Sequence, residues 1–225
     1  MLKIGHRGAK GYEIENTVIS FQKALDMHVD GIELDVHLSA DNEIMVFHDD
    51  TLDRLTNGKG LISSLTLLEL KRFLINAQET IPTLREILNL IDKKCYVNIE
   101  LKSYEVTDPA VTLIEEYVKN KNWKYDDFLV SSFDWNALQQ VRFLNDEIHI
   151  GVLTENNLDL ALAFAKFVQA KSIHPHFLLL TKENTAQIQA KGLQVFPWTV
   201  NEIEDIETIK SYNVNGIITD FPDRI

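Results

Sequence analysis

Cysteine, basic charge and long hydrophobic runs are all scarce in this sequence of 225 residues. The single cysteine, Cys95, excludes a disulfide bond within the chain and is typical of a protein from a reducing compartment. The N-terminus shows no apolar segment of the kind found in secretion signals, and no apolar run is long enough to cross a bilayer. The sequence therefore predicts a soluble, cytoplasmic protein.

Acidic residues outnumber basic ones by 34 to 22, which gives a formal net charge of −12. A charge of this sign argues against nucleic-acid binding and against docking on anionic membranes, so we expect neither nucleic acid nor stable membrane association. The same field repels an anionic small molecule, which would need a local positive site in order to bind. Composition carries no information on the oligomeric state.

Short β-type runs alternate with longer amphipathic stretches along the chain. Eight strands are predicted at 2–5, 31–37 (continued as an extended segment over 43–47), 96–101, 128–131, 149–153, 170–173, 194–197 and 216–219. Helices are predicted at 16–28, 83–93, 109–120, 135–143, 158–165, 182–191 and 202–212. This alternation indicates a parallel sheet with right-handed crossovers. Eight such units predict one α/β domain over residues 1–225, a single (β/α)8 TIM barrel whose last helix is missing.

The connection after strand two, residues 49–81, is too long for an ordinary loop between a strand and a helix. Within it, residues 66–73 have a helical pattern, and Thr66 is placed to cap that helix. We therefore predict a small insertion after strand two that covers one mouth of the barrel. The helix at 83–93 is the one that would otherwise follow the strand directly.

Acidic residues occupy alternate positions on two predicted strands. In residues 31–36 the apolar side chains alternate with Glu33 and Asp35, so the two carboxylates face the same side of the sheet. Glu100 has a similar position near the carboxyl end of strand three, where active sites of such barrels lie. Neighbouring carboxylates repel one another unless a proton or cation intervenes, and oxygen ligands select a hard divalent cation, Mg²⁺ or Ca²⁺. The alternative is a set of strand-end acids paired with lysine and arginine.

Two histidines, His6 and His48, each follow a run of strand residues, so both should reach the same mouth of the barrel. A histidine titrates near neutral pH and can exchange a proton with an attacking hydroxyl or a departing alkoxide. Either residue alone is typical of an ordinary hydrogen-bonded histidine. As a pair around the acids they are predicted to be the catalytic acid and base, and the sequence does not assign which is which.

Two basic residues are candidates for phosphate binding. Arg7 has a planar fork that matches two phosphate oxygens, and Lys102 brings a second positive charge to the same end of the barrel. Charge balance for the acids is their alternative role, and it is compatible with phosphate binding. Glu15 either caps the following helix or binds substrate hydroxyls. Trp198 is predicted to line the substrate site or to be a buried structural residue, and Phe133 to be a packing residue.

Several short motifs that contain these residues follow one another along the chain. They are His6-Arg7-Gly8, Glu15-Asn16-Thr17, Glu33-Leu34-Asp35, His48-Asp49, Asn98-Ile99-Glu100-Leu101-Lys102, Pro197-Trp198-Thr199-Val200-Asn201 and Ile218-Thr219-Asp220-Phe221-Pro222. Each motif alone is weak, but the ordered series, at the intervals of barrel strands, resembles the glycerophosphodiester phosphodiesterase family. The resemblance covers essentially the whole chain.

The resemblance implies metal-dependent hydrolysis of a small-molecule glycerophosphodiester to glycerol 3-phosphate and an alcohol, with His6 and His48 as acid and base. One divalent cation, Mg²⁺ or Ca²⁺, is expected to contact a phosphate oxygen and a glycerol hydroxyl. Its expected ligands are Glu33, Asp35 and Glu100. The residues expected to bind the substrate are Arg7, Glu15, Lys102 and Trp198.

Two other functions remain open at this point: a phospholipase D-like enzyme that acts on lysophospholipids, and a non-catalytic barrel that only binds a phosphodiester. Whether water or a substrate hydroxyl attacks the phosphorus is also open. Because loops at this end of a barrel vary most, the 49–81 segment is expected to control the preference for the head group.

Overall fold

Eight parallel strands form the centre of the molecule in a computed structural model that describes residues 1–225. They are β1 (Leu2–His6), β2 (Gly31–Leu38), β6 (Tyr96–Leu101), β7 (Phe128–Ser132), β8 (His149–Thr154), β9 (Ser172–Pro175), β10 (Gln194–Val195) and β11 (Gly216–Thr219). Each strand pairs with its neighbour in the order β10-β9-β8-β7-β6-β2-β1-β11. Backbone hydrogen bonds from Asn215 to Val195 and from Ile218 to Pro197 join the two ends of this order. The predicted (β/α)8 barrel is confirmed.

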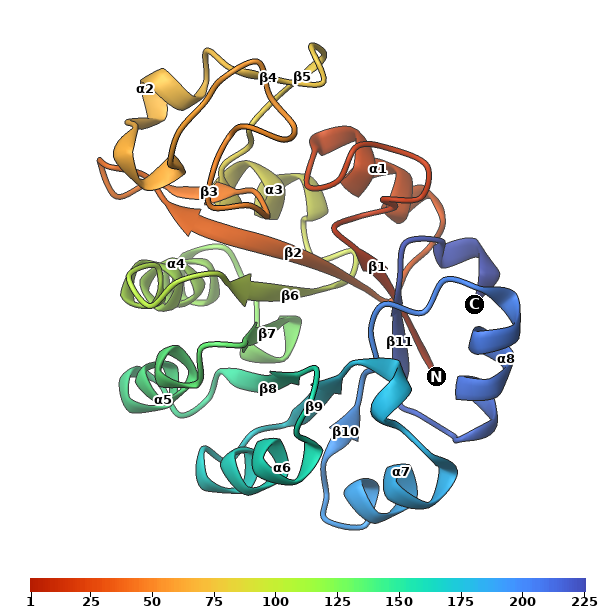
Figure 1. The fold of residues 1–225 in the computed structure, drawn as a ribbon. Coiled ribbons are helices and arrows are strands. Elements are labelled where there is room, and N and C mark those ends of the chain that lie inside the picture. Colours follow the sequence, from red (N-terminus) through yellow and green to blue (C-terminus); the bar gives the residue numbers. More distant parts are fainter.

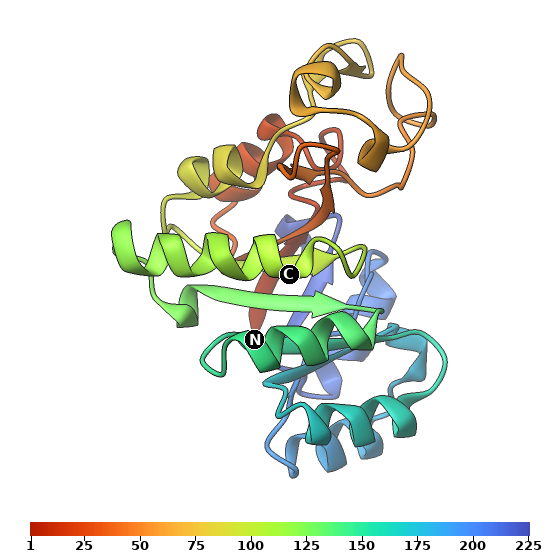
Figure 2. The ribbon, with the colours of Figure 1, turned by 90° about the vertical axis from the view of Figure 1, so that its left-hand side faces the viewer.

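Helices surround the strands in a ring (Figure 1). They are α1 (Val18–Asp26), α3 (Leu84–Ile91), α4 (Thr107–Asn120), α5 (Trp135–Leu144), α6 (Leu158–Phe167), α7 (Lys182–Gln189) and α8 (Ile203–Ser211). Figure 2 shows α4 and α5 running alongside the strands. Apolar strand residues such as Leu34 and Ile99 pack in one core with buried helix residues such as Ile87 and Ile114. Burial of this apolar surface is the main force that holds the two layers together.

Successive side chains of a strand point to opposite faces of the sheet. Those that do not face the helices therefore point into the barrel. The parallel register of β2 and β6 places Glu33 opposite Asn98 and Asp35 opposite Glu100. Because side chains of paired residues project to the same face, these four polar groups lie beside one another. The sequence pattern thus brings two acidic segments together across neighbouring strands, although 65 residues separate Asp35 from Glu100 in the chain.

The insertion begins where β2 turns back on itself. Strand β3 (Ile44–Val46) pairs antiparallel with the end of β2, so the predicted continuation of strand two is a separate strand that runs in the opposite direction. Residues 49–81 then contain η1 (Ile62–Ser64), α2 (Leu67–Leu70), β4 (Leu74–Ile75) and β5 (Glu79–Thr80). Their apolar side chains form a small cluster of their own with β3, which includes Phe47, Leu52 and Leu70. In Figure 2 this segment, in orange and yellow, lies toward the end of the barrel to which the strand arrows point.

Helix starts agree with the capping residues in the sequence, while helix lengths agree less well. Thr66 caps α2 as predicted, but α2 ends at Leu70 because a turn follows it directly. Helix α1 begins at Val18, after its cap Thr17, rather than at residue 16, because Asn16 has a left-handed backbone (φ 57°). The missing last helix is represented only by η4 (Pro222–Arg224). Two further short helices are η2 (Tyr125–Asp127) and η3 (Phe177–Leu179).

No helix in the structure combines the length and the apolar character needed to cross a membrane.

The capping box of α3 allows a direct test of how that helix is held. Thr83 accepts a hydrogen bond from the Glu86 amide, and the Glu86 carboxylate accepts one from the Thr83 amide. Substitution Thr83→Ala should lower the free energy of unfolding by about 1 kcal/mol, because one amide at the start of the helix loses its acceptor. Urea denaturation should show a lower midpoint with an unchanged m value.

The matched control is Thr112→Ala, which removes an exposed hydroxyl from the interior of α4. Its effect should be close to zero, because alanine favours the helix and only a bond to the preceding turn is lost. Equal midpoints for the two variants would contradict the role given to Thr83.

Candidate active site

A cavity of about 230 Å³ opens at the carboxyl ends of the barrel strands. Its lining residues come from β1, β2, β6, β8, β11 and the loops that follow the strands: His6, Arg7, Glu33, His48, Asn98, Glu100, Lys102, Phe133, Leu153, Glu155, Trp198, Thr199 and Ile218. Seven of the nine residues singled out in the sequence are among them. The other two, Glu15 and Asp35, are buried and are held against the cavity wall by Arg7.

The three predicted metal ligands lie together at one side of this cavity. One oxygen each of Glu33, Asp35 and Glu100 lies within 4.8 Å of the others. Burial and the neighbouring carboxylates of Asp35 and Glu100 raise the pKa of Glu33 well above its usual value. Burial and the Asp35 carboxylate raise the pKa of Glu100 to about 7. Three carboxylates therefore cannot all be ionised here without additional positive charge.

Arg7 and Lys102 supply part of that charge. The Arg7 Nε lies 3.2 Å from Asp35 Oδ2, and Lys102 Nζ lies 2.8 Å from Glu100 Oε1 and 3.4 Å from Asp35 Oδ1. Although burial opposes ionisation, these two cations hold the pKa of Asp35 below its usual value. The two cations thus favour ionisation of Asp35, whereas burial and the neighbouring carboxylates oppose ionisation of Glu33 and Glu100.

The carboxylates fit a hard divalent cation. Glu33 Oε1 and Asp35 Oδ1 are buried and have no hydrogen-bond partner, an arrangement that is costly unless another ligand binds them. No cysteine or histidine nitrogen belongs to the cluster, so the donors are all oxygens. Oxygen-only donors of this kind are compatible with Mg²⁺ or Ca²⁺ and do not distinguish between them.

A tight turn after β1 aims the backbone at the same acids. Arg7 has φ 51° and Gly8 has φ 87°, both in the left-handed region. A Cβ atom at Gly8 would lie 2.4 Å from Ser20 Oγ, so no other residue fits this turn without a shift of α1. In this conformation the Arg7 amide donates to Glu33 Oε2 at 2.9 Å. The turn therefore positions both the backbone and the side chain of Arg7 on the acidic cluster.

His6 is oriented by a carboxylate on the last strand. Its Nδ1 is 2.6 Å from Asp220 Oδ1, and the other oxygen of Asp220 accepts a hydrogen bond from Asn201 at 2.8 Å. A carboxylate partner makes Nδ1 the donor, which leaves Nε2 free, 4.0 Å from Glu33 Oε2. Burial lowers the pKa of His6, and the bond to Asp220 opposes this effect.

His48 has the same arrangement as His6. Its Nδ1 is 2.7 Å from Asp49 Oδ1, so its Nε2 is also free. Burial lowers the pKa of His48 as well, while the charge of Asp35 and the bond to Asp49 raise it. The two histidines therefore each combine a carboxylate-bound Nδ1 with a free Nε2, and both line the cavity.

Arg54 of the insertion connects this histidine to the barrel. Its guanidinium donates to both oxygens of Asp49 at 2.7 and 2.8 Å, and to Glu15 Oε1 at 2.8 Å. Glu15 accepts a further bond from Arg7 at 2.8 Å. Glu15 thus bridges two arginines. Its predicted alternative as a helix cap is not what is observed, because Thr17 caps α1.

Aromatic side chains form the opposite wall of the cavity. Trp198 is half-buried, and its indole N–H donates to the His174 carbonyl at 2.7 Å. Phe133 packs edge-on against it with ring centroids 5.5 Å apart. Phe133 thus packs as predicted, but it is also 44% exposed and lines the cavity.

Comparisons with known proteins agree with this geometry. A family profile described as "Glycerophosphoryl diester phosphodiesterase family" matches residues 6–224. The chain belongs to this family.

A glycerophosphodiester phosphodiesterase of Caldanaerobacter subterraneus is 37% identical, over 100% of this chain and 96% of its own length. A solved phosphodiesterase of Oleispira antarctica, in complex with the product sn-glycerol-3-phosphate, is 30% identical with a TM-score of 0.90, over 99% of this chain and 94% of that one. A human lysophospholipase D is 24% identical over 99% of this chain and 84% of its own length.

Four residues that hold the predicted site residues in place, directly or through one another, were given no role from the sequence: Asp49, Arg54, Asn201 and Asp220. Asp220 had a usable signal, because it follows the last strand directly and should lie at the same mouth as His6. Asp49 likewise adjoins His48. Arg54 and Asn201 had no such signal in the sequence. Their contacts depend on the paths of the insertion and of the loop between β10 and α8, which no sequence pattern specifies.

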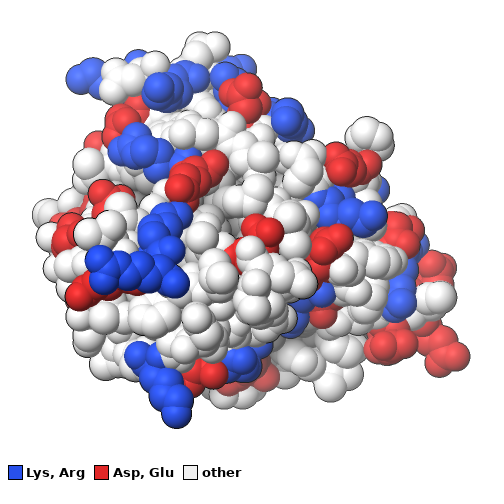
Figure 3. Space-filling view, turned by 90° about the horizontal axis from the view of Figure 1, so that it is seen from above, with Lys and Arg blue, Asp and Glu red and all other residues white.

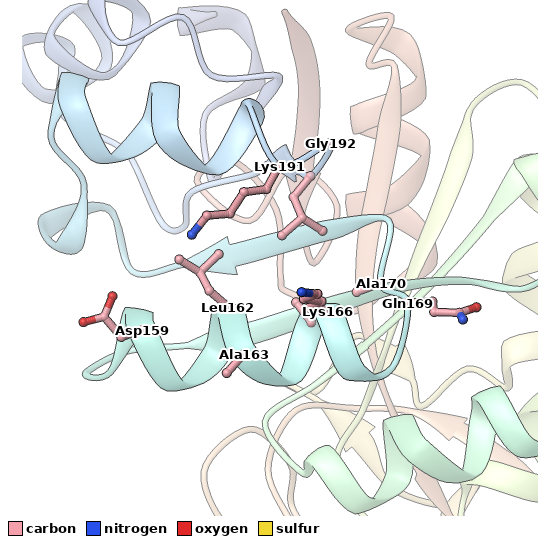
Figure 4. Close-up of a pocket in the computed structure, with 10 residues that line it drawn as sticks. Asp159, Leu162, Ala163, Lys166, Gln169, Ala170, Lys191 and Gly192 are labelled. Carbon is pink, nitrogen blue, oxygen red and sulfur yellow. The ribbon is translucent and has the colours of Figure 1, made fainter.

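A larger cavity, of about 700 Å³, lies elsewhere. It is a groove on the outside of the barrel between α6 and the turn after α7, lined by apolar residues with Asp159, Lys166 and Lys191 at its edges (Figure 4). It contains no histidine and no cluster of acids. On the face seen in Figure 3, acidic and basic side chains are interspersed, and no expanse of one sign dominates.

The Arg54 contacts predict that the first part of the insertion depends on this residue. Substitution Arg54→Lys keeps the charge but cannot bond Asp49 and Glu15 together, because a lysine lacks the planar fork. We expect amide hydrogen exchange of residues 49–62 to accelerate by roughly 5- to 10-fold, since about 1 kcal/mol of anchoring is lost. Mass spectrometry of exchanged peptides measures this directly.

Arg72→Lys, at an exposed arginine of the same insertion, is the matched control and should leave the exchange unchanged. Exchange in the barrel strands should not change in either variant. If amides 49–62 exchanged as slowly in the Arg54 variant as in the Arg72 variant, the role given to Arg54 would be wrong. The insertion would then be held by its apolar cluster alone.

Proposed function

We propose that this chain hydrolyses glycerophosphodiesters to glycerol 3-phosphate and an alcohol, with a divalent cation and two histidines. The observation that carries the proposal is one cavity that holds three clustered carboxylates, two of them with a buried oxygen that lacks a hydrogen-bond partner, together with two histidines whose Nε2 atoms are free. Family membership and the product bound by the Oleispira relative support the substrate class. In this proposal residues 1–225 form one TIM-barrel phosphodiesterase domain, with residues 49–81 as an insertion over its mouth.

Glu33, Asp35 and Glu100 would hold the cation, Mg²⁺ or Ca²⁺. When bound, such an ion supplies positive charge that binds oxygens of the phosphate and the glycerol and makes a bound hydroxyl more acidic. The chain itself contributes the positive charges of Arg7 and Lys102. In the proposal these two side chains orient the phosphate and stabilise the charge that develops on its oxygens during the reaction.

The histidines would carry the protons. One free Nε2 accepts a proton from the attacking hydroxyl, and the other donates a proton to the oxygen of the departing alcohol. Two separate histidines, each held by its own carboxylate, allow one to serve the attacking group and the other the departing group. Asp220 and Asp49 keep each imidazole in the tautomer that this transfer requires. Glu15 is buried behind Arg7 and would act on the substrate through Arg7, which it holds in place, with Trp198 covering the apolar part of the substrate.

Phosphorus NMR tests the reaction and the metal together. Metal-stripped protein should leave glycerophosphoethanolamine unchanged, and addition of Mg²⁺ or Ca²⁺ should convert its diester signal to that of glycerol 3-phosphate. His6→Ala and His48→Ala should each lower turnover by about 10²- to 10⁴-fold, because each removes a proton-transfer group.

Near-normal turnover in both histidine variants would overturn the proton-transfer scheme. Hydrolysis of a lysophospholipid in place of short glycerophosphodiesters would favour the lipid-directed alternative. Tight metal binding without conversion of either substrate would favour a barrel that only binds phosphodiesters.

The contact between His48 and Asp49 predicts a shift in the pH profile. The Asp49 carboxylate stabilises the protonated imidazole, so Asp49→Asn should lower the pKa of His48. The limb of the kcat/KM profile that reports His48 should move to lower pH by about 0.5 to 1. The other limb should stay in place, because Asp220 still holds His6.

Asp50→Asn removes the same charge from the adjacent, exposed residue and is the matched control. It should move neither limb. A profile of the Asp49 variant that superimposes on that of the Asp50 variant would show that the carboxylate does not set the titration of His48.

A further inference from the structure

One charged residue of the cavity wall has no part in the proposed chemistry. Glu155 follows β8 directly, is exposed, and lines the cavity beside Leu153 and the Phe133–Trp198 pair. It makes no ion pair with any lysine, arginine or histidine. An unpaired acid at the mouth of a site for an anionic phosphodiester is unfavourable, unless the substrate itself brings a positive charge to that position.

The two ends of the cavity differ in chemistry. The metal-ligand acids, with Arg7 and Lys102, occupy the inner end, where the proposed function places the phosphate and the glycerol hydroxyls. The other end has aromatic surface and a single carboxylate. Since a phosphodiester has its two alcohols on opposite sides of the phosphorus, a substrate whose glycerol binds among the buried acids would direct its head group to the exposed side of the cavity, where Glu155 and Phe133 lie.

Aromatic faces combined with a carboxylate are the features that recognise an ammonium group. A quaternary or primary ammonium is attracted by the aromatic quadrupole and by the acid together, with estimates of about 0.5 to 2 kcal/mol for each aromatic contact. Trp198 is fixed for this purpose by its hydrogen bond to the His174 carbonyl, so little freedom is lost on binding. The net charge of −12 adds a long-range preference for a substrate that is a zwitterion over one that is a net anion.

We propose that Glu155, Phe133 and Trp198 form a subsite for a cationic head group, so that diesters of ethanolamine and choline are preferred over those of neutral polyols. The inference rests on the proposed function and adds a substrate class to it. It also moves head-group selection away from the 49–81 insertion, where the sequence suggested it, to the loops after β7, β8 and β10.

The test compares kcat/KM for glycerophosphocholine, glycerophosphoethanolamine and glycerophosphoglycerol in the metal-loaded enzyme. Wild type should favour the two zwitterionic diesters by about 10-fold or more. Glu155→Gln should lower this ratio by about 5- to 10-fold, mainly through a higher KM for the zwitterions, and the polyol diester should be hydrolysed somewhat better because a repulsive charge is gone. Phe133→Leu should lower the choline rate more than the ethanolamine rate, since quaternary ammonium depends more on the aromatic face.

Glu147→Gln is the matched control. Glu147 is exposed and lies just before β8, at the opposite end of the barrel, and its substitution changes the net charge by the same amount. Its ratio should equal that of wild type. The subsite is wrong if wild type hydrolyses all three diesters equally, or if Glu155→Gln changes all three rates by the same factor. Absence of hydrolysis with every diester, despite bound metal, would instead overturn the proposed function and the subsite together.

Discussion

Repulsion among three buried carboxylates is the constraint around which the mouth of this barrel is built. Glu33, Asp35 and Glu100 project from neighbouring strands whose register leaves them no room to separate. Neighbouring segments then supply hydrogen-bond donors and positive charges that partly balance the negative charge of these acids. The turn after β1 brings an amide and a guanidinium, the residue after β6 brings the Lys102 ammonium, and two carboxylate oxygens are left without a hydrogen-bond partner. Such incomplete balance in a buried site is compatible with a divalent cation site.

Each histidine is held by a carboxylate that does not belong to this cluster. Asp220 belongs to the end of β11 and Asp49 to the start of the insertion, so each imidazole is held by a different part of the chain. With Nδ1 bound to a carboxylate, each ring is fixed in orientation and keeps its Nε2 free at the cavity. Arg54 then joins the insertion to the barrel through Glu15 and also bonds Asp49, the partner of His48.

The features that could be predicted from the sequence are those that depend on residues close together in the chain, such as alternation along a strand or a cap at the start of a helix. The alternation in Gly31–Val36 determines which side chains face inward, and the barrel order then brings Glu100 next to them. Capping residues such as Thr66 and Thr83 mark where helices start, because their role depends only on the next turn. Contacts between distant segments could not be read in this way. The pairing of Arg54 with Glu15 and the exposure of Phe133 depend on the path of loops whose conformation no periodic pattern specifies.

Charge balance at the mouth also explains how an acidic protein can bind an anionic substrate. Three carboxylates against Arg7 and Lys102 leave a local charge of about −1 when all groups are ionised, and a divalent cation changes this to about +1. The raised pKa of Glu33 and the pKa of about 7 for Glu100 mean that, without the cation, protons take its place. Binding of a divalent cation at this cluster would then release protons, so affinity for the metal would rise with pH. In the proposed function the cation would do more than complete a coordination shell: it would make this part of an otherwise negative molecule attractive to a phosphodiester.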